Sequence, residues 1–264
     1  MPELPEVQTI VNGLKSHIIK KQISQIRQCR KGTVVSHCHV DEFGQINTLK
    51  RRGKYIIITT SKEIKIIIHL GMTGKLIYTI EADVKPSHCR AEIIFTDGGR
   101  IFFDDVRTFG KIHLFRINDT VTALENMGVE PLSDSFDVEY LSTKLKQRKA
   151  PIKNMLMNQH IVAGLGNIYA MEILHRSHID PRTRSKDLST QEITEIVKQT
   201  KTVLKEAMMY NGTTVSDYRQ IEDKKGEFQN FLRVYQKERC NCGTGIKRIK
   251  MAGRSTYFCP ECQE

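Results

Sequence analysis

The hydrophobic pattern changes from the period of strands to the period of helices beyond the middle of the chain, and this change most constrains the fold. Between about residues 22 and 116, apolar residues gather in short β-branched runs such as "KYIIITT", "IKIIIHL" and "KIHLF". Runs of this kind, bounded by turn residues, predict strands. After residue 137 the apolar positions recur every three or four residues, which predicts helices. We therefore expect an α+β protein in which an all-β part precedes a mainly helical part.

The all-β part is preceded by one helix. Residues 5–18 carry apolar side chains at intervals of three and four, which predicts an amphipathic helix lying on a sheet. Farther along, "TDGG" separates "EIIF" from "RIFF" and predicts a hairpin, because Asp and Gly accept the positive φ of primed turns. Strands this regular favour a two-sheet β-sandwich or a flattened barrel.

The segment "GVEPLSDSFD" (128–137) is interpreted as a linker because Pro, Gly, Ser and Asp gather there. Beyond it we expect helices over 138–147, 151–158, 167–175 and 190–209, the last opened by Ser189 and Thr190 with Glu192 downstream. At the end of the chain we expect a two-stranded ribbon that turns at residues 252–254. The expected division is a β-sandwich domain (1–130), a helical domain (131–225) and a C-terminal ribbon (226–264).

The net charge and the hydropathy of the chain limit the kinds of molecule that the protein is expected to bind. With 41 Lys and Arg against 30 Asp and Glu, the formal net charge is +11, which attracts polyanions such as nucleic acid. No apolar stretch approaches the roughly 20 residues that a membrane span needs, and residues 1–20 do not resemble a secretion signal. We expect a cytosolic protein with no membrane partner.

The cysteines are unevenly distributed. Four of the seven lie between residues 240 and 262, which in a reducing compartment favours a metal site over disulfides. Cys259 and Cys262 have the two-residue spacing of a zinc knuckle, but only one residue separates Cys240 from Cys242. Four thiolates around one zinc ion are favoured over a reduced, metal-free ribbon, and the short gap leaves weakened zinc affinity open.

The N-terminus offers a nucleophile. A Met followed by Pro is expected to be removed, which would leave Pro2 with a free secondary amine. An α-amino group of pKa about 8 is roughly a tenth neutral at pH 7, whereas a lysine is neutral less than about one part in a thousand. Such an amine can attack a sugar carbon and form a Schiff base, with Glu3 moving protons. In the alternative, which composition alone favours, Pro2 and Pro5 start a helix and Glu3 and Glu6 complement its dipole.

Six segments, taken together and in this order, resemble the formamidopyrimidine-DNA glycosylases. They span nearly the whole chain: "MPELPEV", "HLGMTG", "DVRTFG", "AGLGNIYAMEIL", "GTTVSDY" and the Cys-rich end. The related endonuclease VIII branch usually has Gly at the position of Leu4. The resemblance implies a monomeric bacterial enzyme of base excision repair, a DNA glycosylase and AP lyase. Its expected partner is double-stranded DNA with oxidised purines (8-oxoguanine, formamidopyrimidines) or abasic sites, gripped in a positively charged cleft between two domains.

The resemblance also implies roles for residues at matching positions. Pro2 would attack C1′ of the damaged nucleotide and expel the base, Glu3 would shuttle protons, and β,δ-elimination would then cleave the strand on both sides of the sugar. Lys54 would contact a phosphate beside the lesion, and Glu6 matches a pocket carboxylate of less certain role. Without the resemblance, Lys54 is one solvated lysine among many.

Base removal requires the nucleotide to leave the stack. The resemblance implies that Met72, Arg107 and Phe109 fill the resulting void. Their loops are flanked by Gly, which favours exposed turns over the alternative of buried sandwich core.

In the helical part, "NQHIVAGLGNIYAMEIL" resembles the helix-two-turn-helix element of the family, with Asn167 expected to cap the following helix. The segment "GTTVSDYRQIEDKKGEF" matches a loop over the extruded base. The remaining implied residues are one structural zinc ion on Cys240, Cys242, Cys259 and Cys262, and DNA contacts by His88, Arg107, Lys153, Asn167 and Arg254.

Two other functions remain open at this point. The distorted cysteine pair motivates a catalytically silent module that binds lesions or DNA. A closer rival is a glycosylase for oxidised pyrimidines.

Overall fold

The structure is a computed structural model that describes residues 1–81, 85–213 and 226–263. The chain forms two compact units: Met1–Thr122 with Asn211–Glu227, and Ala123–Tyr210 with Phe228–Glu264. In chain order the elements are α1 (Leu4–Ile18), β1 (Gln22–Gln28), β2 (Val34–Ser36), β3 (Gly44–Arg52), β4 (Tyr55–Thr60), β5 (Ile64–His69), β6 (Lys75–Thr79), β7 (Cys89–Phe95), β8 (Arg100–Asp104), β9 (Lys111–Arg116), α2 (Thr122–Glu125), α3 (Val138–Leu145), α4 (Ile152–Leu156), α5 (Asn167–Arg176), η1 (Ser185–Asp187), α6 (Thr190–Met209), η2 (Phe228–Phe231), β10 (Lys247–Met251) and β11 (Arg254–Phe258).

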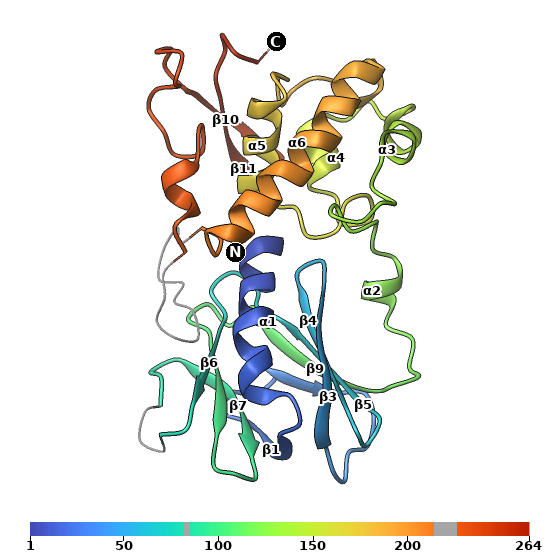
Figure 1. The fold of residues 1–264 in the computed structure, drawn as a ribbon, viewed down its shortest axis with the longest axis vertical. Coiled ribbons are helices and arrows are strands. Elements are labelled where there is room, and N and C mark those ends of the chain that lie inside the picture. Colours follow the sequence, from blue (N-terminus) through green and yellow to red (C-terminus); the bar gives the residue numbers. More distant parts are fainter. Residues whose placement is uncertain (82–84, 214–225, 264) are drawn as a thin grey trace. The chain divides into compact units, whose positions relative to one another are not determined.

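Helix α1 confirms the prediction of an amphipathic helix over 5–18. Glu3 is its N-cap and forms a capping box with Glu6, and Pro5 lies in the first turn. The capping box satisfies backbone N–H groups that have no partner within the helix. One face of the helix, from Leu4 to Ile18, is buried, and α1 contacts β3, β4 and β6 (Figure 1).

The strands of the first unit form one continuous sheet, in the order β2-β9-β5-β4-β3-β1-β7-β8-β6. Strand β1 pairs with β3 at only two positions, Gln22 with Gln45 and Ile23 with Gly44, so it joins two halves of the sheet. Apolar residues of both halves and of α1 belong to one core. The predicted N-terminal helix and β-rich unit are confirmed, and the two halves expected as separate sheets are joined through β1 into one sheet.

The hairpin between β7 and β8 is present, but its turn differs from the prediction. Phe95 N donates to Gly99 O (2.9 Å), so the loop is longer than a two-residue primed turn. Positive φ falls on Gly98 (+88°) and not on Asp97. The Asp97 carboxylate instead accepts from Gly99 N (3.0 Å), a short-range bond that Asp commonly makes in turns.

In the second unit, α5 packs against α6 and β11, and α3 packs against α6. The predicted capping box of Ser189 and Glu192 opens α6. Residues 128–137 are not an exposed linker: Gly128 N donates to Gln159 O (2.8 Å), Val129 bridges to Val162, and Phe136 is fully buried. The turn residues there shape a packed segment that ends at Asp137, the N-cap of α3.

Among the described helices, none combines the length and apolar character needed to span a bilayer.

Candidate functional site

The N-terminus lies in a charged, partly buried environment. Pro2 is buried and Glu3 is 3% exposed. The Met1 α-amino group has its pKa lowered from the ordinary value, mainly by burial; Glu3 and Glu6 oppose this shift, while Lys54 and Arg107 add to it. Loss of a proton near neutral pH makes an amine nucleophilic. The first unit therefore brings the chain terminus together with the predicted Glu3, Lys54 and Arg107.

Glu6 connects α1 to a segment distant in sequence. Its Oε2 accepts from Glu3 N (2.8 Å), and its Oε1 accepts from Thr213 N (2.8 Å) and Thr213 Oγ1 (3.1 Å). Gly212 has φ of +78°, and a Cβ there would lie 2.6 Å from Glu6 Oε1, so the approach requires glycine. Of the predicted loop over the extruded base, residues 214–225 lie outside the described residues.

Lys54 is not a solvated lysine. It is 6% exposed in the turn between β3 and β4. Burial, together with the charge of Lys54, lowers the pKa of His69 at the end of β5. A buried ammonium requires partners that stabilise its charge, and this burial distinguishes Lys54 from the many lysines on the surface.

Two loops that carry predicted void-filling residues are joined by the buried Asp105. Its carboxylate accepts from Thr73 Oγ1 (2.5 Å), Arg107 N (3.2 Å) and Gly110 N (2.8 Å). Asp105 itself is 0% exposed. The carboxylate thus links loop 70–74 to loop 105–110. Sequence reasoning did not single out Asp105, although an Asp at the start of a tight loop is a common turn signal.

The side chains presented by these loops are exposed. Met72 is 40% exposed and Phe109 is 55% exposed, which confirms the prediction of exposed turns over buried core. The Arg107 guanidinium lies 5.0 Å from the centre of the Phe109 ring. Gly71 has φ of +61°, and a Cβ there would lie 2.7 Å from Gly110 N, so the two loops approach each other at a glycine.

His88 lies beside the same loop. Its N–H donates to Asp104 Oδ1 (3.0 Å) and its carbonyl accepts from Asp105 N (3.1 Å). The imidazole Nδ1 lies 3.0 Å from Ser87 Oγ. The backbone of His88 is therefore fixed against the start of the 105–110 loop.

In the second unit, Lys153 and Asn167 are direct neighbours. Lys153 is 1% exposed, and its ammonium donates to Asn167 Oδ1 (2.7 Å) and Thr256 Oγ1 (2.7 Å). Asn167 Nδ2 donates to Ser255 O (3.1 Å). The helix-two-turn-helix segment is thereby bonded to the C-terminal ribbon.

The predicted capping role of Asn167 is wrong. The N-cap of α5 is Gly166, without a side-chain cap, and Asn167 is the first helical residue. The Asn167 side chain cannot cap because its amide is engaged by Lys153 and by the ribbon.

Arg254 is exposed and begins β11. The preceding turn consists of Ala252 and Gly253, both with positive φ (+45° and +76°), as in a primed two-residue hairpin turn. Strands β10 and β11 pair over five positions, so the turn holds Arg254 at the tip of the ribbon.

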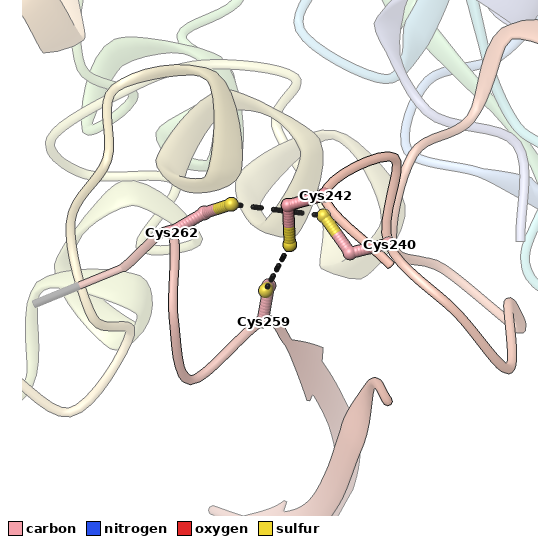
Figure 2. A group of neighbouring side chains, drawn as sticks. All are labelled: Cys240, Cys242, Cys259 and Cys262. Atoms are coloured by element: carbon pink, nitrogen blue, oxygen red, sulfur yellow. Dashed lines mark hydrogen bonds between the residues drawn. The ribbon is translucent and has the colours of Figure 1, made fainter. Parts of the chain in front are cut away.

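The four cysteines of the ribbon converge (Figure 2). All four Sγ atoms lie within 4.8 Å of one another; Cys240 and Cys262 are 3.8 Å apart, and Cys242 and Cys259 are 3.6 Å apart. With Zn–S bonds of about 2.3 Å, a tetrahedron has edges of about 3.8 Å. The thiols therefore fit one zinc ion despite the single residue between Cys240 and Cys242.

A tight turn accommodates that short gap. Gly243, with φ of +90°, donates its N–H to Cys240 O (2.9 Å), and Cys240 N donates to Thr244 O (2.8 Å). Hydrogen bonding to Thr244 lowers the pKa of the Cys242 thiol to about 6, which favours the thiolate that a metal requires.

Two residues of α5 that the sequence did not single out support the ribbon. The buried Glu172 carboxylate accepts from the backbone N–H groups of Arg233 (2.7 Å), Val234 (3.1 Å) and Tyr235 (2.9 Å). His175 Nε2 lies 3.2 Å from Cys240 Sγ, and burial lowers the pKa of His175 to about 4. The sequence pattern predicted both only as positions of a helix.

Comparison with protein families accounts for most of the chain. Residues 1–112 match the N-terminal domain of formamidopyrimidine-DNA glycosylase, residues 127–219 match its H2TH domain, and residues 238–264 match the zinc finger found in FPG and IleRS. A formamidopyrimidine-DNA glycosylase of Wolbachia pipientis from Culex pipiens is 40% identical over the full length of both chains. The chain belongs to the formamidopyrimidine-DNA glycosylase family.

Other relatives agree. The formamidopyrimidine-DNA glycosylase of Desulforamulus reducens is 39% identical, covering 100% of this chain and 99% of the relative. The crystal structure of the MutM (FPG) protein of Thermus thermophilus superposes with a TM-score of 0.91 at 33% identity, covering 99% and 98% of the two chains. A Lactococcus lactis FPG mutant bound to DNA containing Fapy-dG gives a TM-score of 0.91 at 32% identity, with 100% of both chains covered.

Membership in the formamidopyrimidine-DNA glycosylase family establishes the activity. The chain is a DNA glycosylase of base excision repair, in a family that also carries AP lyase activity. The zinc finger match and the four-cysteine cluster agree on one structural zinc ion.

Proposed function

We propose that the enzyme excises oxidised purines, 8-oxoguanine and formamidopyrimidines, from double-stranded DNA through a Schiff base on Pro2. The observation that supports the proposal is the partly buried chain terminus. Burial and the charges of nearby side chains shift the pKa of its amine; these side chains are Glu3, Glu6, Lys54 and Arg107. A terminus that merely started a helix would not require a buried lysine beside it. The helix-starting role is real as well, since Glu3 caps α1 while lying next to the amine.

In the proposed reaction the Pro2 nitrogen attacks C1′ and the damaged base leaves. Glu3 carries protons between the sugar and the leaving base, as a carboxyl group within the site can do. The sugar ring then opens: the C1′–O4′ bond breaks, O4′ takes up a proton, and an iminium forms between Pro2 and C1′. The iminium acidifies C2′, and β,δ-elimination breaks the strand on both sides of the sugar. Lys54 binds a phosphate beside the lesion and keeps the sugar in reach of the amine.

The reaction requires removal of Met1. In the structure Met1 precedes Pro2, so the Pro2 nitrogen is a peptide amide and cannot form an iminium. After processing, the Pro2 amine would occupy the environment whose burial lowers the pKa of the present terminal amine. Burial of this kind leaves a larger fraction of the amine neutral, and therefore nucleophilic, than in an exposed α-amino group.

We further propose that Met72, Arg107 and Phe109 enter the space left by the extruded nucleotide. The large apolar side chains would replace lost stacking, and the guanidinium would donate to the orphaned base. Two observations support this role. The side chains are exposed, and the Asp105 carboxylate holds the loops that carry them, so that an inserted side chain would project from an anchored loop.

The second unit would hold the phosphate backbone. Lys153 and Asn167 lie together at the start of α5, where helix N–H groups favour anions, and Arg254 projects from the ribbon. His88 and Arg107 would add contacts from the first unit. We propose residues 1–130, 131–225 and 226–264 as the catalytic, helical DNA-binding and zinc-ribbon parts of a monomeric, cytoplasmic enzyme.

The test is a comparison of substrates with matched variants. We expect release of 8-oxoguanine from duplex DNA to exceed release of thymine glycol, and Glu3→Gln to lose base release while it keeps binding an abasic-site analogue. Preferential release of thymine glycol would favour the oxidised-pyrimidine alternative. Binding without release of any oxidised base would favour a silent lesion-binding module.

A further inference from the structure

A second group of metal-binding side chains lies in the first unit, away from the four-cysteine cluster. It consists of Cys29, which follows β1, and Cys89 and Glu92 of β7. Strands β1 and β7 are paired, and Cys29 N donates to Arg90 O (2.9 Å). In a regular strand, residues three apart point to opposite faces. The register of β7 shifts between Cys89 and Ala91, and this irregularity returns Cys89 to the side of Glu92.

The donor atoms have the spacing of a tetrahedral metal site. The Cys29 and Cys89 sulfurs are 3.8 Å apart, and Glu92 Oε1 lies 3.4 Å from Cys29 Sγ and 3.9 Å from Cys89 Sγ. For zinc bonds of about 2.3 Å to sulfur and about 2.0 Å to oxygen, tetrahedral edges are about 3.8 Å and 3.5 Å. The sulfur separation equals that of Cys240 and Cys262 in the ribbon.

The surroundings suit a bound cation with one open position. Glu92 is 1% exposed, and its other oxygen, Oε2, lies 3.4 Å from Arg27 Nη1, an outer contact that orients the carboxylate. Cys29 is exposed, so water can reach the fourth position. A positive charge already lies there: Lys85 Nζ is 2.6 Å from Glu92 Oε1 and 3.7 Å from Cys29 Sγ. The Lys85 side chain is 53% exposed and can turn into solvent.

We propose that Cys29, Cys89 and Glu92 bind a second zinc ion, with a water molecule as fourth ligand, in competition with the Lys85 ammonium. Two thiolates and one carboxylate form a donor set that suits zinc over the oxygen-seeking magnesium and calcium ions.

Strand β7, which carries two of the proposed ligands, is hydrogen-bonded to loop 105–110. Arg90, between the two β7 ligands, donates from Nε to Asp105 O (2.7 Å). Asp105 is the residue that holds loops 70–74 and 105–110 together. Arg90, which follows Cys89 directly in the chain, is therefore hydrogen-bonded to the loop that carries Arg107 and Phe109.

The experiment measures zinc per chain in the full-length enzyme after saturation with zinc and removal of free metal by gel filtration. We expect two ions in the wild type and one in Cys29→Ser or Cys89→Ser. Cys38→Ser is the matched control, because Cys38 belongs to neither cluster, and should keep two. Lys85→Met should bind the second ion about tenfold more tightly than the wild type, because the competing charge is gone.

Cobalt substitution gives a second readout. Thiolate-to-cobalt absorption should decrease in Cys29→Ser while the contribution of the ribbon site remains, and binding of lesion DNA verifies that the variant is folded. One zinc ion in the wild type would overturn the proposal, as would two ions in a folded Cys29→Ser variant. A Lys85→Met variant that binds the second ion no more tightly would overturn the competition with lysine.

Discussion

The loops of the first unit and the ribbon of the second unit both present exposed side chains, but they are held by different means. Phe109 projects from loops anchored by the Asp105 carboxylate above a core shared by α1 and the sheet. Arg254 projects from a two-stranded ribbon whose far end is held by four thiols. The first arrangement is complete in the polypeptide, whereas the second depends on a bound ion.

The largest expected effect comes from breaking the metal site of the ribbon. Structural zinc contributes about 10–16 kcal/mol in small zinc-finger peptides, so Cys259→Ser or a strong chelator should unfold residues 240–263. Hydrogen exchange should show loss of protection in β10 and β11, with the strands of the first unit unchanged. If the ribbon amides remain protected from exchange without zinc, the ribbon does not depend on the ion, and the two regions do not differ in this respect.

Asp105→Ala tests the anchoring of the loops. It removes the acceptor for the N–H groups of Arg107 and Gly110, and an unsatisfied buried group costs about 1–3 kcal/mol. We expect about 3 kcal/mol lower stability in urea unfolding and weaker binding of lesion DNA. Asp105→Asn, which keeps one acceptor oxygen, should lose less. Equal stability of all three proteins would show that the core alone fixes the loops.

Glu172→Gln tests how far the ribbon relies on α5 as well as on zinc. The amide keeps one acceptor oxygen but turns donors toward the backbone N–H groups of residues 233–235. We expect a loss of about 2 kcal/mol with zinc bound. Thermal unfolding at constant zinc measures it, with Glu139→Gln, at an exposed position of the same unit, as control. No change would mean that the ion alone supports this segment.

Met72→Ala and Phe109→Ala should have the smallest effect on stability. Both side chains are exposed, so the change should stay within about 0.5 kcal/mol. Affinity for duplex DNA containing an abasic-site analogue should nevertheless fall about tenfold, because stacking in the void is lost. A fluorescence titration measures this. Unchanged affinity would remove these residues from the proposed void-filling role.

Periodicity was sufficient to predict the longest helices, because their buried faces repeat along the chain, but it did not predict the short α2, and it extended α4 beyond its observed end. The α1 and α6 predictions agree with the structure to within a residue, and the capping pair Ser189 and Glu192 marks the start of α6. Strands β1 and β3 were not predicted as separate strands, because their many polar residues obscure the alternation of apolar and polar positions. The burial of β3 alternates along a sequence, "GQINTLKRR", that contains few apolar residues.

The site was predictable only where a residue type carries its own chemistry. Pro2 and the cysteines were proposed in that way, whereas the loop residues Met72, Arg107 and Phe109 were proposed from the family resemblance. Asp105 and Glu172 could not be predicted, because their importance comes from backbone N–H groups that only the fold brings to them. The capping role predicted for Asn167 was wrong for the same reason, because the fold brings its side chain to Lys153, which lies 14 residues away in sequence.

Borohydride trapping on DNA containing 8-oxoguanine, followed by sequencing of the modified peptide, identifies the nucleophile and so tests the assignment of Pro2. We expect a reduced adduct on a peptide that begins at Pro2, and strongly diminished trapping by Pro2→Gly with DNA binding retained. An adduct on a lysine, or full activity in molecules that keep Met1, would contradict this assignment.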